Sequence, residues 1–243
     1  MITSYKKKWN ISNTIFYVNY DRSKIIYFCY RQNRDGIYLA KISKYKKNEM
    51  DVIKKLKNMN YIIQIKDLFY NEHGSIIIMK YYPNLDLQKY LSMSYNYSLD
   101  IIIFNLLQCI ISLHKMKIYH RDIKLENFII DHEYGFKVLL SDFEMATENL
   151  RLNNKQGSLY YLPPEYFTNK CVDNKKRDFW ALGVVIYFLI YKDFPFNGES
   201  YTEIKYNILN QKIKYKKVNN KYKILLINLL KKNPEKRLII ELK

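Results

Sequence analysis

The stretch His120-Arg121-Asp122-Ile123-Lys124-Leu125-Glu126-Asn127 concentrates basic, acidic and amide side chains within eight residues. An apolar helical pattern ends at about Met116, shortly before it, and short β-rich segments at 128–131 and 137–140 follow it. We therefore expect the stretch to be a loop that rigid elements hold on both sides. A merely polar surface loop is the alternative interpretation.

The segments on either side of this loop are predicted to be mostly helical. Leu85–Leu91 has the pattern of a short helix, and Ser98 is a candidate N-cap for the long helix that runs to Met116. After the two short strands, an irregular polar stretch extends to Glu165. Helical patterns return at 178–191, 202–210 and 221–231.

The first third of the chain is β-rich instead. Asn33-Arg34-Asp35-Gly36 and Asn71-Glu72-His73-Gly74 are turn signals that each separate two apolar runs. A helix is predicted between the third strand and the fourth. The five predicted strands lie at about 13–18, 24–31, 37–43, 62–70 and 75–81.

These patterns predict an α+β fold with two lobes inside a single domain, 1–243, because no Pro-, Gly- or Ser-rich linker divides the chain. The β-rich N-lobe, with one main helix, covers about 9–81, the hinge about 80–85 and the mainly helical C-lobe about 85–243. The final helix is expected to be clipped, since the sequence stops soon after Arg237.

The stretch 120–127 also matches a family pattern. Five of its positions fit the protein-kinase sequence of His-Arg-Asp, a Lys two residues beyond the Asp and an Asn five residues beyond it. Five fixed matches arise by chance in roughly one of ten thousand chains of this length. The sequence resembles the eukaryotic protein kinases, serine/threonine type, over nearly its whole length, which implies their bilobal fold. The further matches, in the family's order, are Asp142-Phe143, Gly157-Ser158, Tyr161-Leu162-Pro163-Pro164-Glu165, Asp178, Trp180, Gly183 and Arg237.

The resemblance implies transfer of the ATP γ-phosphate to protein Ser or Thr hydroxyls, with Mg²⁺ as the metal. Asp122 would orient the hydroxyl and accept its proton, and Lys124 would lie against the γ-phosphate, where negative charge develops. Asn127 and Asp142 would bind Mg²⁺ through hard oxygen atoms. Lys41, on the third predicted strand, would hold the α- and β-phosphates.

Glu49 is the predicted partner of Lys41. It shares a helix face with Val52, Ile53 and Leu56, so it points toward the core, where an unpaired carboxylate is costly. An exposed Glu on a frayed first turn is the alternative. Because Glu49 follows Lys41 by only eight positions, the connecting loop must be tight.

The resemblance also implies a set of supporting contacts. The hydroxyl at the position of Ser158 hydrogen-bonds near the catalytic Asp and Lys in the family, and Ser158 together with Lys124 is typical of serine/threonine kinases. Ile26 above and Ile129 below would line an apolar adenine slot, which Leu39 narrows because the family usually has a small Ala there. The residues expected to contact the nucleotide beside Lys41, Asn127 and Asp142 are Asn19, Ile26, Leu39, Lys80, Tyr82 and Ile129.

Departures from the family pattern leave an alternative function open. The segment Asn19–Lys24, where the phosphate-covering loop is expected, contains no Gly, although Gly lets backbone amides approach phosphates closely. Glu144 replaces the family's Gly after Asp142-Phe143 and adds a negative charge beside the metal-binding Asp. We predict an active kinase, with a pseudokinase that acts as a binding or scaffold module as the alternative.

The segment before Gly157 indicates how the predicted kinase is regulated. Residues 149–156 contain no Ser, Thr or Tyr. In many kinases a phosphate in this segment docks on the Arg of the catalytic loop. With no hydroxyl in 149–156, Glu148 or Glu144 is the candidate partner of Arg121. We expect that the enzyme does not need activation-segment phosphorylation, with Thr147 and Ser158 as the hydroxyls that could be modified instead.

The composition limits the partners and the compartment. Lys and Arg number 41 against 23 Asp and Glu, which gives a net charge of +18. Because the lysines are scattered and accompany abundant Asn, Ile and Tyr, coding bias is favoured over a dedicated polyanion site, and only nonspecific electrostatic binding of nucleic acid is expected. The chain has no apolar run of membrane-spanning length, and its three cysteines are far apart and outside any metal-ligand spacing. No signal peptide is expected, because no apolar stretch follows the basic residues near the start of the sequence. We therefore expect a cytoplasmic or nuclear monomer whose partners are ATP and protein substrates.

Overall fold

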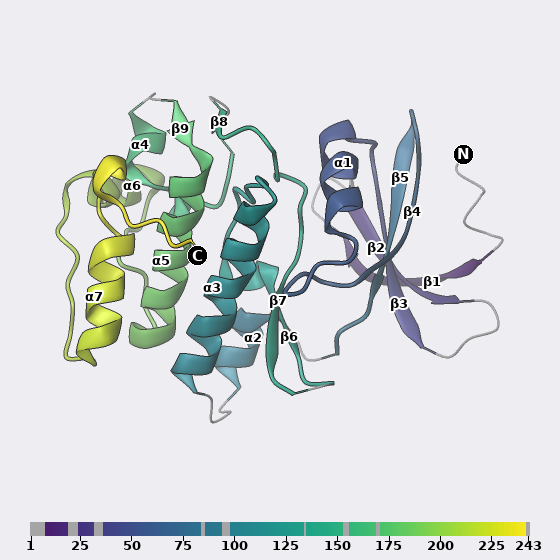
Figure 1. Cartoon of the computed structure of the whole chain (residues 1–243), viewed down its shortest axis with the longest axis horizontal. Helices are drawn as coiled ribbons and strands as arrows, with labels where there is room; N and C mark the ends of the chain where they lie inside the picture. Colours follow the sequence, from purple (N-terminus) through teal and green to yellow (C-terminus); the bar gives the residue numbers. More distant parts are fainter. Residues whose placement is uncertain are drawn as a thin grey trace. The chain divides into compact units, whose positions relative to one another are not determined.

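The computed structural model describes residues 8–18, 24–31, 36–83, 86–93, 98–133, 135–152, 156–168 and 171–241. The chain forms two compact units, Met1–Pro83 and Asn84–Lys243. Unit 1 contains a sheet with one helix, and unit 2 contains most of the helices (Figure 1). No helix in the described ranges is both long and apolar enough to cross a membrane.

Unit 1 is built on an antiparallel five-stranded sheet with the strand order β1-β2-β3-β5-β4. Its first strand begins at Trp9, four residues before the predicted strand, and its fourth begins at Ile65, three residues after the predicted one. The predicted turn at 33–36 lies mostly outside the described residues. The strands are β1 (Trp9–Val18), β2 (Lys24–Arg31), β3 (Ile37–Ser43), β4 (Ile65–Asn71) and β5 (Gly74–Lys80).

The two faces of this sheet have different roles. On one face the Trp9 side chain is only 1% exposed and packs with Cys29, Ala40 and two isoleucines of β5. The indole Nε1 donates a hydrogen bond to Asp67 Oδ2 at 2.7 Å, so the buried polar atom is satisfied. Because side chains alternate along a strand, Lys41 lies on the opposite face from Ala40. Lys41 is cross-strand from Ile26 on β2.

The helix of unit 1 is α1 (Lys47–Leu56), as the apolar spacing predicted. It buries Glu49 together with Met50, Val52, Ile53 and Leu56. The carboxylate therefore lies on the inward face of an otherwise apolar helix surface, which requires a charged partner.

Unit 2 pairs long helices with two small sheets. The predicted strands at 128–131 and 137–140 are present with those bounds and pair as one antiparallel sheet. A second sheet pairs β8, which lies within the stretch predicted to be irregular, with β9, which lies beyond that stretch. The elements are α2 (Leu87–Ser92), α3 (Leu99–Lys115), η2 (Leu125–Asn127), β6 (Phe128–Asp131), β7 (Lys137–Leu140), β8 (Arg151–Leu152), η3 (Leu159–Tyr161), α4 (Pro164–Phe167), β9 (Val172–Asp173), α5 (Asn174–Tyr191), α6 (Tyr201–Asn210), α7 (Asn220–Leu229) and η4 (Pro234–Lys236).

Two helix starts show where capping differs from the sequence pattern. Helix α5 begins at Asn174, four residues before the prediction, because the Asp173 side chain accepts a hydrogen bond from Lys176 N and caps it. Ser98 is the N-cap residue of α3, but its side chain makes no capping hydrogen bond. The predicted position of the N-cap was right, but the capping hydrogen bond expected from the Ser98 side chain is not made.

A buried ion pair joins two distant parts of unit 2. Arg237 donates from Nη1 to Glu165 Oε1 at 2.6 Å and from Nη2 to Oε2 at 2.9 Å, and both side chains are almost fully buried. The guanidinium also lies 4.9 Å from the ring centroid of Trp180. Two parallel hydrogen bonds and a ring contact satisfy a charge that would otherwise be costly at this depth.

We predict that Glu165→Gln lowers the free energy of unfolding of unit 2 by about 3 kcal/mol, because it leaves the buried Arg237 charge without compensation. Glu235→Gln is the matched control, since Glu235 is an exposed carboxylate paired with Lys176 and should change little. Urea unfolding followed by circular dichroism measures both. Equal effects of the two substitutions would contradict the importance of the buried pair.

Candidate active site

The loop 120–127 is attached to α5 through one carboxylate. Asp178 accepts hydrogen bonds from the backbone N–H of His120 and of Arg121, both at 2.8 Å, and lies 2.9 Å from His114 Nε2. Two consecutive amides can point at one carboxylate because Arg121 has a φ of 69°, a left-handed conformation that non-glycine residues rarely adopt. The structure therefore holds a strained turn immediately before Asp122.

Asp178 remains charged although it is fully buried. Burial acts to raise its pKa, but the hydrogen bond from His114, the charges of His114 and His120 and the bond from the Arg121 backbone together lower the pKa below its usual value. A charged carboxylate accepts these hydrogen bonds more strongly than a neutral one. The loop 120–127 is therefore attached to α5 by hydrogen bonds to an ionised carboxylate.

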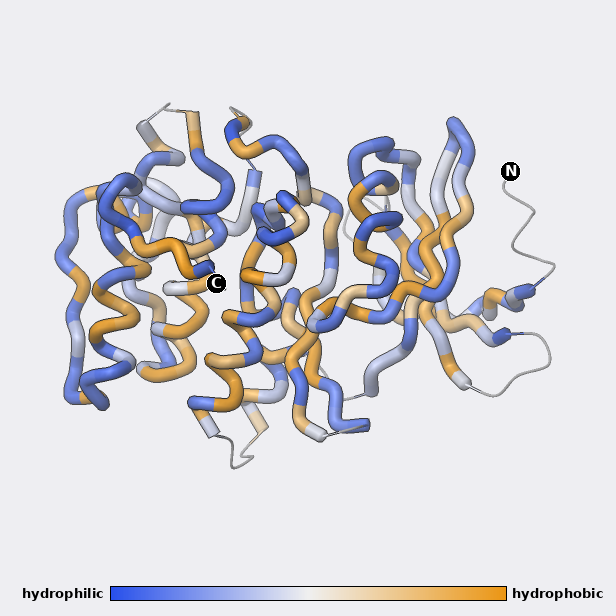
Figure 2. Tube along the Cα trace, viewed as in Figure 1, coloured by the Kyte–Doolittle hydropathy of each residue, from blue (hydrophilic) through white to orange (hydrophobic). Residues whose placement is uncertain are grey.

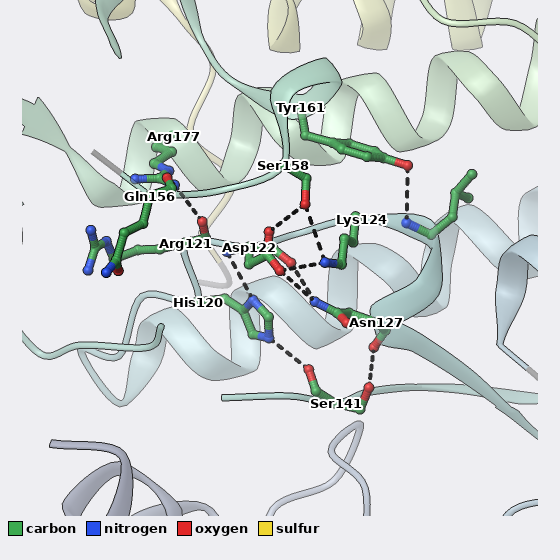
Figure 3. Close-up of polar contacts among 11 residues, drawn as sticks. His120, Arg121, Asp122, Lys124, Asn127, Ser141, Gln156, Ser158, Tyr161 and Arg177 are labelled. Atoms are coloured by element: carbon green, nitrogen blue, oxygen red, sulfur yellow. Dashed lines mark hydrogen bonds and ion pairs between the residues drawn. The ribbon is translucent and has the colours of Figure 1, made fainter. Parts of the chain in front are cut away.

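Asp122 lies at the centre of a polar cluster (Figure 3). Ser158 Oγ donates to Asp122 Oδ1 at 3.0 Å, and Lys124 Nζ lies 2.8 Å from Asp122 Oδ2 and 3.3 Å from Ser158 Oγ. Asn127 Nδ2 donates to the backbone oxygen of Asp122 at 2.7 Å and to Oδ2 at 3.3 Å. Four of the predicted site residues therefore come together within hydrogen-bonding distance.

Lys124 lies in a negative environment. Burial acts to lower its pKa, but the hydrogen bond and charge of Asp122 and the charges of Glu126 and Asp142 outweigh it, so the pKa is raised. Lys124 is therefore a firmly protonated cation. The contribution of Asp142 also shows that this carboxylate lies near Lys124.

Asn127 and Asp142 are placed by the β6–β7 pair. Ser141 donates from its backbone N at 2.8 Å and from Oγ at 2.9 Å to the backbone oxygen of Asn127. His120 Nε2 lies 2.9 Å from the backbone oxygen of Ser141 (Figure 3). Asp142 follows with a φ of 57°, a second left-handed non-glycine residue at this site. Backbone strain at two neighbouring turns is typical of functional sites.

No sequence motif indicated a role for Arg177. This residue is 3% exposed, and its Nη2 donates to the backbone oxygen of Arg121 at 2.7 Å and to that of Gln156 (Figure 3). It therefore connects the loop 120–127 to the segment that carries Ser158. Long-range bonds to backbone carbonyls leave no periodic pattern, so a sequence can reveal such a residue only as an unusual charge in an apolar helix.

Two buried guanidinium groups lie close together as a result. The pKa of Arg121 is lowered to about 10 by burial and by the positive charge of Arg177, which Asp178 opposes in part. Arg121 Nη1 also donates to the backbone oxygen of Met145 at 3.3 Å. The arginine that the resemblance assigns to phosphate docking thus donates to the main chain of the segment that follows Asp142-Phe143.

In unit 1 the predicted partners Lys41 and Glu49 are in contact. Lys41 Nζ lies 2.7 Å from Glu49 Oε1, and both side chains are buried. The second oxygen of the carboxylate, Oε2, has no hydrogen-bond partner among the described residues. The short connection between β3 and α1 brings the two residues together despite their separation of only eight positions.

The remaining predicted contacts are placed as follows. Leu39 is 7% exposed and is cross-strand from Met79, while Ile26 and Ile129 are half-buried. Lys80 ends β5, and its Nζ lies 5.2 Å from the ring centroid of Tyr82. Asn19 lies outside the described residues, as does most of the Gly-free segment at 19–24. Glu144 is half-buried.

Comparison with known proteins identifies the class to which this fold and site belong. Residues 26–242 match the protein kinase domain family. The chain therefore belongs to the protein kinase family, and its α+β fold class is the one that the sequence predicted.

Serine/threonine kinases are among its relatives. Aurora kinase B of Mus musculus is 30% identical over 196 residues, which cover 79% of this chain and 56% of that protein. An Aurora kinase of Patiria pectinifera is 26% identical over 96% of this chain and 62% of its own length. The serine/threonine-protein kinase AtPK2/AtPK19 of Arabidopsis thaliana is 30% identical over 88% of this chain and 46% of its own length. The chain thus spans about half of the length of these relatives.

We predict that Gly157→Ala disrupts the connection made by Arg177. Gly157 has a φ of 125°, and an added Cβ would lie 2.5 Å from Arg177 Nη2, so the methyl group would displace the guanidinium. Amide hydrogen exchange across 156–162 should accelerate about tenfold, because local opening becomes easier.

Gly135→Ala is the matched control for this test. Gly135 also has a positive φ, of 90°, but an added Cβ there meets no neighbouring atom. This variant also places a side chain at a positive φ and should leave exchange across 156–162 unchanged. A similar acceleration in both variants would show that backbone strain, and not Arg177, controls the segment.

Proposed function

We propose that this chain is an active serine/threonine protein kinase, with units 1 and 2 acting as the N-lobe and C-lobe of one domain around a hinge at about 80–85. The observation that carries this proposal is the cluster of Asp122, Lys124, Asn127 and Ser158, in which a carboxylate is held by an amide, an ammonium and a hydroxyl. Its substrates would be ATP and the Ser or Thr hydroxyls of proteins.

Asp122 is proposed as the group that accepts the substrate proton. The hydroxyl oxygen forms a bond to the γ-phosphorus, its proton passes to the Asp122 carboxylate, and the bond to the bridging oxygen breaks to release ADP. Lys124 would stabilise the negative charge that develops on the transferred phosphoryl group. The hydrogen bond from Ser158 fixes the carboxylate orientation, which supports its role in positioning Asp122.

Asn127 and Asp142 fit a magnesium site by the chemistry of their donor atoms. The amide nitrogen of Asn127 is bonded to Asp122, so its Oδ1 is the atom that can bind a cation. One amide oxygen and one carboxylate suit Mg²⁺, which takes its other ligands from phosphates and water. Bound magnesium would neutralise phosphate charge.

In unit 1, the buried Lys41–Glu49 pair supports a role for Lys41 in holding the α- and β-phosphates. The ion pair fixes the ammonium on one face of the sheet, and Ile26 and Leu39 belong to that same face. We propose that these two residues, together with Ile129, Lys80, Tyr82 and Asn19, contact the nucleotide.

A pseudokinase is the second candidate. The segment 19–24 contains no Gly, and Glu144 occupies the position at which the family has Gly, so close amide contacts to the phosphates are weakened. The full set of chemically essential residues favours activity, because a scaffold does not require it. These residues are Lys41, Asp122, Lys124, Asn127 and Asp142.

We predict that Mg·ATP raises the melting temperature. A ligand at about 100 times its Kd stabilises the native state by about 2.7 kcal/mol, which corresponds to roughly 5–10 °C for a chain of this size. Lys41→Met should remove most of the shift, whereas Lys44→Met, at an exposed position on the same connection, should keep it. Differential scanning fluorimetry measures the three proteins, and no shift in the wild type would contradict nucleotide binding.

We predict that Asp122→Asn lowers phosphate transfer at least about 10²-fold, the usual contribution of a positioned base, while the shift with Mg·ATP persists. Incorporation of labelled phosphate into a generic basic and a generic acidic protein substrate measures the rate. Asp51→Asn, which removes an exposed carboxylate of α1, is the control and should retain full activity. A thermal shift without any Asp122-dependent transfer would establish the pseudokinase.

A further inference from the structure

Half of the net positive charge lies in one part of unit 2. Residues 204–234 contain nine lysines and no Asp, Glu or Arg, so they carry +9 of the net +18. They comprise most of α6, the connection 211–219 and α7. Among the ion pairs of the described residues, Lys221 with Asp100 is the one that involves a lysine of this part. The other eight lysines of this part form no ion pair with any residue that the structure describes.

Three of these lysines are presented in a regular row. Lys212, Lys214 and Lys216 are exposed, whereas the intervening Ile213 and Tyr215 are half-buried. Alternation with a period of two residues is the pattern of an extended chain, in which side chains on one side repeat at about 6.6 Å. We call these three residues the lysine row. The connection runs along the outside of the helices of unit 2 and is mostly hydrophilic (Figures 1 and 2).

Two tyrosines of α5 fix the row in place. Tyr187 donates its hydroxyl to the backbone oxygen of Lys214 at 2.8 Å, and Tyr191 donates to that of Lys216 at 3.3 Å. Alternate carbonyls of the row are therefore tied to a buried helix. An ordered row of charges loses less conformational entropy on binding than a flexible basic loop would.

The outer edge of the connection offers hydrogen-bond donors as well. In an extended chain, successive residues direct their backbone groups to opposite edges. The backbone carbonyls of Lys214 and Lys216 point toward the tyrosines. The backbone groups of Ile213 and Tyr215 therefore point to the opposite, outer edge. Their N–H groups donate no hydrogen bond to another described residue. Such an edge can pair with the backbone of an added extended segment.

A hollow opens at one end of the row. It has a volume of about 380 Å³, and its lining includes Lys212, Lys232, Gln211, Ile213 and Leu230. The Lys232 ammonium lies 5.1 Å from the ring centroid of Phe196, and burial lowers its pKa with no opposing contribution from a carboxylate. A partly buried cation without an anionic partner gains most from a carboxylate that enters the hollow.

We propose that the lysine row and this hollow form a docking site for an extended, acidic polypeptide segment of a partner protein. Alternate acidic side chains of such a segment would match the 6.6 Å spacing, and its backbone would pair with the outer edge of the connection. An apolar side chain would pack against Ile213 and Leu230. Tyr187 and Tyr191 are bonded to the chain, and Tyr215 is half-buried against Tyr187, so these rings offer no platform for stacked bases.

The test is a binding measurement, which goes beyond the proposed activity and does not depend on phosphate transfer. A labelled peptide of about twelve residues, with Glu at every second position and one Leu, is titrated with the full chain at about 0.15 M salt. Lys212→Glu/Lys214→Glu/Lys216→Glu should weaken binding at least about tenfold. Lys232→Gln, which leaves the row intact, should weaken it about threefold.

The matched control reverses the charge of three exposed lysines outside residues 204–234, in the variant Lys44→Glu/Lys47→Glu/Lys137→Glu. It has the same net charge as the row variant and should change the affinity less than about twofold. Equal weakening by both triple variants would overturn the proposal in favour of a diffuse electrostatic field. Tighter binding of a single-stranded RNA of equal charge than of the peptide would also overturn it, because the occupant would then be a nucleic acid.

Discussion

The buried carboxylate of Asp178 is the interaction on which the arrangement of unit 2 depends. It belongs to α5 and accepts hydrogen bonds from the backbone amides of the two residues that precede Asp122, so a helix in the core holds the loop 120–127. Burial alone would neutralise this group, and the hydrogen bonds and histidine charges around it reverse that tendency. The strain at Arg121 persists because the ionic hydrogen bonds offset it.

Arg177, which precedes Asp178 on α5, adds a second connection to the loop. Asp178 accepts hydrogen bonds from the loop, and Arg177 donates hydrogen bonds to the loop and to the segment that leads to Ser158. Adjacent residues of opposite charge on the first half of α5 thus position two segments that are distant in sequence. Burial lowers the pKa of both guanidinium groups, and the positive charge of Arg177 lowers the pKa of Arg121 further, so the closeness of the two groups opposes this arrangement. A direct bond from Arg177 also supplies an ordering contact that does not require a phosphate.

Apolar periodicity predicted the elements well, because it records which side chains are buried. The bounds of β6 and β7 agreed with the prediction, and the inward position of Glu49 followed from its apolar neighbours. Periodicity does not record polar contacts over long separations. The start of β1 at Trp9 accompanies a hydrogen bond to Asp67, 58 residues away, and the start of α5 depends on the cap supplied by Asp173.

The same limit applies to the charge. Composition alone favours coding bias, since bias adds lysines wherever a sequence tolerates them. Bias of this kind does not exclude Asp and Glu from 31 consecutive residues, 204–234, while carboxylates occur throughout the rest of unit 2. Coding bias also does not explain why two tyrosines of α5 donate hydrogen bonds to alternate carbonyls of the connection that carries these lysines. Net charge is a property of the whole chain, but binding depends on where the charges lie and on how firmly the backbone holds them. An excess of lysine that the sequence explains by composition can therefore form a specific binding surface, because its lysines are aligned on a fixed, extended segment.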